Sequence, residues 1–275
     1  MAYPTVSAAY GFKPVNLIGG QPYAGSTRNL PIAYNYGTAI YYGSPVVLTS
    51  GFVTIATLPI NSTNLTIGYF AGCYYTNPTT KQRQYSQYYP GSVTAGDITA
   101  IVVDDPDVVL KCVATASASS ATVASFSQLL VGGNVVCGTQ TGSANNGDAL
   151  TGVVAAGAVA ATTAGFRVLQ LVPDTQTAAS GTYVSGTGTT SLVVSGLPTS
   201  TYFPIGTDVY NVTSSGQLQF TGSALTAAST TAATSGSTTL TVTASTVAVT
   251  GTVALVITPE ALVKTNFGVH SYNVA

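Results

Sequence analysis

The stretch ITAIVVDDPDVVLKCV, residues 98–113, sets the pattern on which the fold depends. Two runs rich in Ile and Val, residues 98–103 and 108–113, flank the acidic segment DDPD. Side chains branched at Cβ fit a pleated strand better than a helix, and Asp and Pro are ordinary turn formers. The stretch therefore predicts two strands joined by a turn at residues 104–107.

Further short strand candidates follow one another on both sides of this stretch. Turn signals separate them at intervals of about 8 to 15 residues, which is typical of a barrel or sandwich. Residues 114–130 are the exception and favour a short helix. The strand candidates lie at residues 45–49, 52–57, 65–75, 82–89, 135–136 and 166–172.

Residues 1–43 predict an extended arm, because Gly and Pro recur too often for any helical period to survive. The arm nevertheless carries large apolar groups, among them Tyr10 and Phe12. An extended segment with so many apolar side chains is expected to lie against its own domain or against a neighbouring subunit.

The composition changes near residue 176. From there to residue 257 the only charged residue is Asp208, while Thr, Ser, Gly and Ala dominate. Residues 188–195 and 236–243 echo one another, and residues 204–210 and 215–220 are typical of a hairpin. Charge and aromatic residues return after Pro259. Residues 176–257 are therefore interpreted as an inserted β-sandwich module, and residues 44–175 plus 258–275 as the β-barrel or sandwich domain that it interrupts.

Charge is scarce in the whole chain. Charged residues make up 5% of the 275 residues, against about 25% in an ordinary soluble domain. Seven scattered cations cannot neutralise a run of phosphates, so a nucleic-acid partner is not expected. The uninterrupted apolar runs are shorter than the roughly 18 residues of a spanning helix, so no membrane span is expected either.

The residues that could carry catalysis or metal binding do not form a recognisable pattern. His270 is the only histidine, and no G-x-S-x-G or H-E-x-x-H motif is present. Asp104, Asp105 and Asp107 are interpreted as a turn between strands, with a cation site or an inter-subunit pairing with Lys or Arg as alternatives. The widely spaced Cys73, Cys112 and Cys137 are expected to be buried free thiols. The sequence thus predicts a protein that is not an enzyme and has no cofactor.

Tyrosine is abundant, with 17 residues, and many of them cluster. Tyrosine is enriched at protein interfaces because it buries a large area and keeps a polar tip. The clusters therefore favour a broad face that contacts another protein, with a mixture of core and surface positions as the alternative for single residues. They are Tyr34, Tyr36, Tyr41 and Tyr42; Tyr69, Tyr74 and Tyr75; and Tyr85, Tyr88 and Tyr89.

Several short segments resemble a family of virion structural proteins of marine tailed bacteriophages, described as capsid decoration or cement proteins. The Thr/Ser-rich residues 176–257 fall outside this resemblance. The segments are YGFKPV at 10–15, GG at 19–20, GSTR at 25–28, GCYYT at 72–76, YYP at 88–90, VDDPD at 103–107, FRVL at 166–169, VKTN at 263–266 and HSY at 270–272.

The resemblance implies a β-barrel-like domain attached to the outside of an icosahedral head. The expected partner is the major capsid protein, whose subunits this protein would bridge and cement, as a homo-oligomer that we expect to be a trimer. The alternatives are a tail or fibre component or a host-surface adhesin, and, as a third class, a glycan depolymerase. The expected interface residues are Tyr10, Phe12, Lys13, Arg28, Tyr85, Tyr88, Tyr89, Lys264 and His270.

Overall fold

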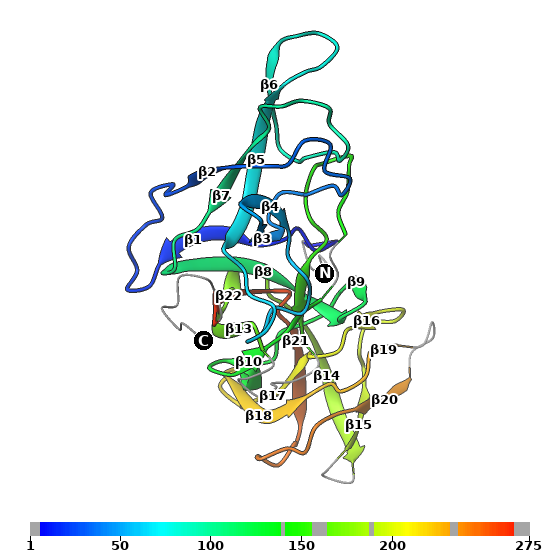
Figure 1. The fold of residues 1–275 in the computed structure, drawn as a ribbon. Coiled ribbons are helices and arrows are strands. Elements are labelled where there is room, and N and C mark those ends of the chain that lie inside the picture. Colours follow the sequence, from blue (N-terminus) through cyan, green and yellow to red (C-terminus); the bar gives the residue numbers. More distant parts are fainter. Residues whose placement is uncertain (1–5, 139–140, 156–163, 187–189, 232–235, 267–275) are drawn as a thin grey trace.

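The computed structural model describes residues 6–138, 141–155, 164–186, 190–231 and 236–266. Strands dominate these residues, and the helical segments described are two single turns of 3₁₀ helix, η1 (Gln128–Leu130) and η2 (Pro173–Thr175). The expected all-β class is therefore confirmed. The molecule is elongated: an open sheet lies at one end, a barrel in the middle and the inserted module at the other end (Figure 1).

The open sheet is antiparallel and packs one face against its own core. Phe70, Cys73 and Val102 point into this core, and the loops that cover it supply Ile40 and Tyr89. The strand order is β2 (Arg28–Pro31), β7 (Thr99–Val103), β5 (Gly68–Thr76), β3 (Pro45–Thr49) and β4 (Phe52–Ile55), with β6 (Arg83–Ser86) paired to the outer half of β5.

The chain passes from the open sheet to the barrel through the stretch that the sequence singled out. Strand β7 ends at Val103, residues 104–107 form the predicted turn, and β8 (Val108–Ser117) begins the barrel. Val103 and Tyr69 face the barrel core rather than the core of the open sheet. The two bodies therefore share packed side chains at the crossover.

The barrel closes because one short segment serves both of its edges. Asn134–Val135 (β10) pairs with β13, and Cys137–Gly138 (β11) pairs with β12. The sheet thus returns to itself within five residues of chain. Its order is β10, β13 (Phe166–Leu171), β22 (Glu260–Thr265), β8, β12 (Gly152–Val154) and β11, and β1 (Lys13–Leu17) and β9 (Ser120–Val123) also pair with β8.

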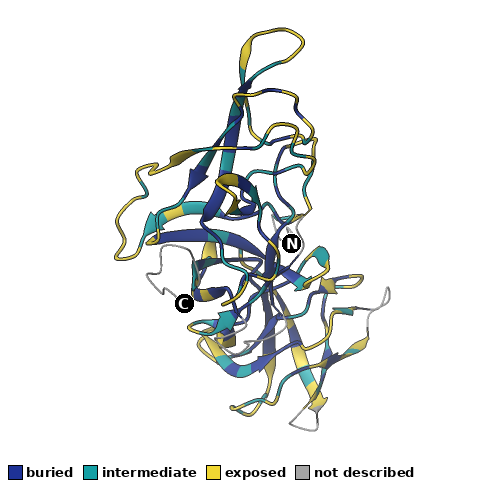
Figure 2. Cartoon of the chain, in the orientation of Figure 1, coloured by how far each residue is buried: buried dark blue, intermediate teal, exposed yellow. Residues whose placement is uncertain are grey.

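Alternate residues of the barrel strands fill its interior. Leu110, Cys112 and Ala114 of β8 are fully buried, as are Phe166 and Val168 of β13. Successive side chains of a strand point to opposite faces, so this period of two is the expected pattern of a barrel. In Figure 2 most of β8 and of the inner half of β5 has the buried colour, because other parts of the chain cover their second face as well.

The module is a six-stranded sheet that also curls upon itself. Backbone bonds from Thr226 to Thr241 (3.0 Å) and from Thr243 to Ala224 (2.9 Å) join its two edge strands. The echoed segments become neighbours, since Leu192 faces Leu240 across the β15–β20 ladder. The order is β18 (Leu218–Ala224), β17 (Asp208–Val212), β21 (Thr252–Ile257), β14 (Thr177–Gly186), β15 (Ser191–Ser195) and β20 (Ser237–Thr241), with β16 (Tyr202–Phe203) and β19 (Ser229–Thr230) paired separately.

The helix expected over residues 114–130 is wrong. The segment continues β8 to Ser117, turns, and returns as β9, and only Gln128–Leu130 is helical. Ala favours a helix in isolation, but here Ala114 pairs with Val153 of β12 and packs in the barrel core. Tertiary pairing therefore outweighs local propensity.

The N-terminal segment, as far as the structure describes it, lies against its own chain. Strand β1 pairs with β8, and β2 pairs with β7. Phe12 packs inside the barrel, with its ring stacked on Phe166 at a centroid distance of 4.5 Å. Of the two expectations for the arm, the structure favours contact with its own domain.

Asp208 joins the module to the barrel. Its carboxylate accepts hydrogen bonds from the Ser127 hydroxyl at 2.5 Å and from the Gln128 backbone N–H at 2.8 Å. Next to it, Ser125 N–H donates to the Ile205 carbonyl at 2.9 Å. Burial raises the pKa of Asp208 to about 6, against the opposing effect of the two hydrogen bonds. The only charged residue of the module is thus buried at the junction and does not lie on the module's surface.

The first prediction concerns the pH dependence that Asp208 brings to folding. A carboxyl group with a higher pKa in the folded state binds its proton more tightly there, so it favours folding below pH 3.8, and this advantage is lost as the pH rises through 6. Relative to Asp208→Asn, the free energy of unfolding of the wild type should fall by about 3 kcal/mol between pH 3.5 and 7. Urea unfolding of both proteins measures the difference, and a difference that is constant with pH would contradict the prediction.

The second prediction is that the barrel folds without the module. Thr177 and Ile257 are paired neighbours, so the chain enters and leaves the module side by side. Replacing residues 178–256 by Asn-Gly should close a two-residue hairpin and leave a cooperative thermal transition. The transition should lie several degrees lower, because the contacts of Asp208 and Ile205 are lost. Circular dichroism measures it, and a chain without a cooperative transition would disprove the autonomy of the barrel.

Candidate interaction surface

The hairpin formed by β5 and β6 projects from the open sheet and ends in a well-defined loop (Figure 1). Asn77 shapes the loop, because its side-chain oxygen accepts hydrogen bonds from the N–H groups of Thr79 (2.8 Å) and Thr80 (3.2 Å). Two backbone bonds close it: the Asn77 N–H donates to the Gln82 carbonyl at 2.8 Å, and the Lys81 N–H donates to the Asn77 carbonyl at 2.9 Å. The hairpin is therefore held in one shape without a covering layer.

Tyr85 is an exposed aromatic side chain in a fixed position. It is 62% exposed, yet its hydroxyl donates to the Ala71 carbonyl at 3.2 Å and its ring lies across Gly72. A Cβ at Gly72 would come within 2.5 Å of the Tyr85 hydroxyl, and the glycine has a φ of 130°. Gly72 also lies at a bulge in β5, so the strand is shaped to receive the ring.

Arg83 lies on the same face as Tyr85, two residues earlier in β6. Its guanidinium stacks on the ring of Tyr74 at 4.2 Å. The face thus presents a fixed tyrosine and a fixed arginine, the residue types that dominate binding energy at protein interfaces.

Asp97 holds the end of β5 near this face. Its carboxylate accepts hydrogen bonds from the Thr76 hydroxyl at 2.7 Å and from the Thr76 N–H at 3.0 Å, and these bonds lower the pKa of Asp97.

The other predicted tyrosines occupy different environments. Tyr88 is half-buried and stacks on Tyr41 at a centroid distance of 5.4 Å. Tyr89 is fully buried, and its hydroxyl donates to the Tyr36 carbonyl at 2.7 Å. The expectation that Tyr89 and Phe12 belong to a contact face is therefore corrected, since both fill this chain's own cores.

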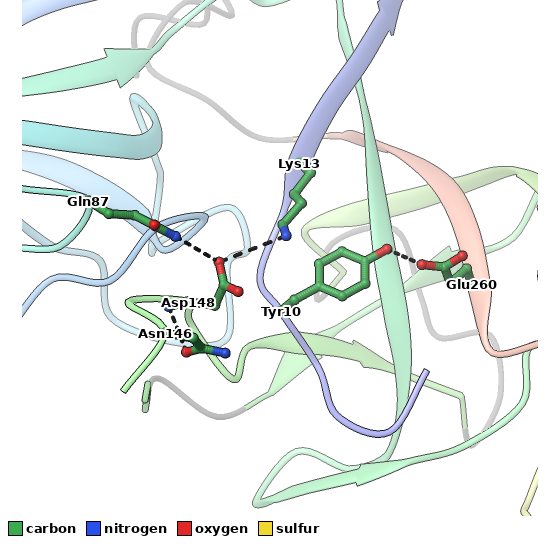
Figure 3. Close-up of polar contacts among 6 residues, drawn as sticks. All are labelled: Tyr10, Lys13, Gln87, Asn146, Asp148 and Glu260. Atoms are coloured by element: carbon green, nitrogen blue, oxygen red, sulfur yellow. Dashed lines mark hydrogen bonds and ion pairs between the residues drawn. The ribbon is translucent and has the colours of Figure 1, made fainter. Parts of the chain in front are cut away.

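Lys13 joins three parts of the chain at the base of the open sheet (Figure 3). Its ammonium lies 4.5 Å from the centre of the Tyr10 ring and 3.8 Å from the Asp148 carboxylate. Gln87 donates to the same carboxylate at 3.2 Å, and Asn146 accepts from the Asp148 N–H at 3.1 Å. Lys13 therefore stabilises the internal packing of the N-terminal segment.

Tyr10 donates a hydrogen bond to Glu260, which is only 2% exposed (Figure 3). Lys111 lies 3.2 Å from the same oxygen, Oε1 of Glu260. The other oxygen is buried without a hydrogen-bond partner among the described residues. Burial, and then the bond to Glu260, hold the pKa of Tyr10 far above its usual range. This pair fastens the N-terminal segment to β22 at the barrel wall.

The acidic turn pairs with cations of the same chain. Asp104 lies 2.6 Å from Arg28, Asp107 lies 3.1 Å from Lys264, and Asp105 accepts from the Asp107 N–H at 2.9 Å. The interpretation as a turn between strands is confirmed. Within the described part of the chain, no group of three His, Cys, Asp or Glu residues is placed to hold a metal ion. A cleft of about 260 Å³ adjoins this turn.

The cysteines and the histidine were also singled out from the sequence. The thiols of Cys73, Cys112 and Cys137 are free and buried, as expected, and burial raises the pKa values of Cys73 and Cys137 to about 12. His270 lies outside the described residues. Sequence reasoning missed the contact between Arg83 and Tyr74. The signal that could have found it is the alternation of side chains over residues 82–89, which is typical of a strand with one open face.

Comparison with protein-family models, with curated proteins and with solved structures finds no match to this chain. In the described residues, no helix has the length and apolar character that crossing a membrane would require.

The third prediction tests the bond between Tyr10 and Glu260. Tyr10→Phe removes a hydrogen bond to a buried carboxylate and leaves it with Lys111 alone, so the free energy of unfolding should fall by about 1.5–3 kcal/mol. Denaturant unfolding measures this change. Tyr34→Phe is the control, because Tyr34 is 66% exposed and should have almost no effect. Equal effects of the two substitutions would contradict the assignment.

Proposed function

We propose that the chain is a non-enzymatic structural protein of a bacteriophage particle, which decorates the outside of the icosahedral head. In this role it bridges subunits of the major capsid protein and cements the shell, acting as a homo-oligomer, with a trimer as the expected form. The observation that carries the proposal is the projecting β5–β6 hairpin. It offers Tyr85 and Arg83 in fixed positions, so little side-chain freedom would be lost on docking.

The distribution of charge supports this orientation. Fourteen of the fifteen charged residues lie outside residues 176–257, and the fifteenth, Asp208, is buried at the junction. The module therefore presents only neutral side chains to water, chiefly Thr and Ser. It lies at the far end of the molecule from the hairpin (Figure 1). A protein docked through the hairpin would hold the module outward.

The assignment to a phage rests on the resemblance of the short segments in the N-terminal part and the last residues. Two of them have structural roles here: VDDPD forms the crossover turn, and GCYYT contains the glycine under Tyr85. A modest contact area suffices for a cement protein, because the contact repeats over the whole shell.

A tail or fibre component, or a host-surface adhesin, is the second candidate. The small cleft of the module described below favours it, because such a protein needs a recognition site at its outer end. Copy number separates the two: hundreds of copies per particle indicate the head, and a few dozen or fewer indicate the tail. Quantitative mass spectrometry of purified particles gives the number.

The fourth prediction concerns Tyr85. If the hairpin docks on the capsid, Tyr85→Ala should weaken binding to particles that lack the protein by about 30-fold, the effect of losing a 2 kcal/mol hot spot. Sedimentation of particles with added protein measures the bound fraction. Tyr202→Ala, which removes an exposed tyrosine of the module, should bind normally.

Particles restored with the wild type should also survive heating better than bare particles. Unchanged binding of Tyr85→Ala would rule out the hairpin as the attachment surface, and bare particles of full heat resistance would rule out the cement role.

A further inference from the structure

A small cleft opens at one end of the module's curled sheet. It has a volume of about 130 Å³ and lies between the ends of β14 and β15 and the segment that follows β20. Mouths of β-barrels are common places for ligand sites. The cleft is lined by Tyr183, Ser191, Leu192, Ser223, Val242, Thr243, Ser245, Thr246, Val247, Ala248 and Val249.

Hydrogen bonds from outside the cleft hold its outer wall in place. The Thr221 carbonyl accepts from the N–H of Thr246 and from the hydroxyl of Ser245, both at 2.9 Å. Asn211 donates to the Ala248 carbonyl at 2.8 Å and accepts from the Thr250 N–H at 3.2 Å. Residues 243–250 of this wall are not part of a strand, but these hydrogen bonds hold Ser245, Thr246, Ala248 and Thr250 in place. The cleft is therefore preformed.

Gly222 permits this arrangement. It has a φ of 75°, and a Cβ there would lie 2.2 Å from the Thr246 hydroxyl oxygen. A side chain at residue 222 would push the wall away from β18. The backbone of the strand is thus adapted to the segment that closes the cleft.

The chemistry of the lining selects the class of ligand. Val242, Val247 and Val249 supply apolar surface, Tyr183 supplies an aromatic ring with a hydroxyl, and Ser191 supplies a further hydroxyl. None of the lining residues is charged. An ion would meet no opposite charge there, and burying it would be costly. A ring with apolar C–H faces and hydroxyls on its rim matches such a site, because it can contact the apolar wall and exchange hydrogen bonds with hydroxyls.

We propose that this cleft binds an uncharged sugar ring, as presented at the end of a glycan. The volume admits one edge of a single ring rather than a chain of rings, so the site recognises a terminal sugar. This function is separate from attachment through the β5–β6 hairpin, since β6 and the strands that line the cleft, β14, β15 and β18, lie at opposite ends of the molecule (Figure 1). Both could operate at once in a docked protein.

The test is titration of the purified full-length chain with neutral methyl glycosides of glucose, galactose, mannose and N-acetylglucosamine, followed by NMR chemical shifts. At least one should bind saturably, and the methyl glycoside of glucuronic acid should bind no more tightly. Ser191→Ala and Tyr183→Ala should each weaken binding at least tenfold, while Tyr202→Ala, outside the cleft, should not.

Tyr183 also packs against the module's core, so thermal unfolding must show that its variant is folded; Ser191→Ala leaves the core intact and keeps the test decisive. Absence of binding across the neutral panel would overturn the proposal, as would equal binding by Ser191→Ala and the wild type. Neither result depends on attachment to a particle, so failure of this site and failure of the cement role can be told apart.

Discussion

Strand β8 is the element to which the rest of the molecule is joined. It pairs with β1 and β22 along its first half and with β12 and β9 along its second half. These partners come from the N-terminal segment, from the strand that returns after the module, and from the chain that follows β8 itself. The buried backbone groups of β8 require these partners, because unpaired ones would cost free energy comparable to a lost hydrogen bond. This requirement brings distant segments together.

The scarcity of charge makes the few ion pairs informative. Among the described residues, the four ion pairs link segments far apart in the sequence: Lys13 with Asp148, Arg28 with Asp104, Lys111 with Glu260, and Lys264 with Asp107. The module uses hydroxyls and backbone carbonyls instead, as in the hydrogen bonds that gather on Thr221. The pair of Lys111 with Glu260 has a buried carboxylate, whereas the other three lie nearer the surface. Because ion pairs near the surface contribute little to stability, the main effect of these three is to fix which segments meet.

The two ends of the molecule suit two different kinds of contact. At one end, Tyr85 and Arg83 are large side chains held by Gly72 and Tyr74, which is the chemistry of a protein interface. At the other end the surface is neutral and rich in hydroxyls, with one small preformed cleft. The barrel between them carries Asp208's partners, so it also sets where the module points. Because the two surfaces are far apart, attachment at one end would leave the other end free for recognition.

The sequence by itself determined the all-β class, the turn at residues 104–107 and the burial of the three thiols. Branched side chains favour strands, Asp and Pro favour turns, and a small apolar thiol favours burial. Each of these preferences can be recognised from the residue type and its neighbours in the sequence. The tertiary structure alone decided which strands pair, and it therefore overruled the helix over residues 114–130, where Ala114 joins the ladder with β12. It also decided that Tyr89 is buried while Tyr85 is exposed, although both belong to one cluster. A period of two indicates which side chains share a face, but segments elsewhere in the chain, such as the one around Tyr36 and Ile40, decide which face is covered.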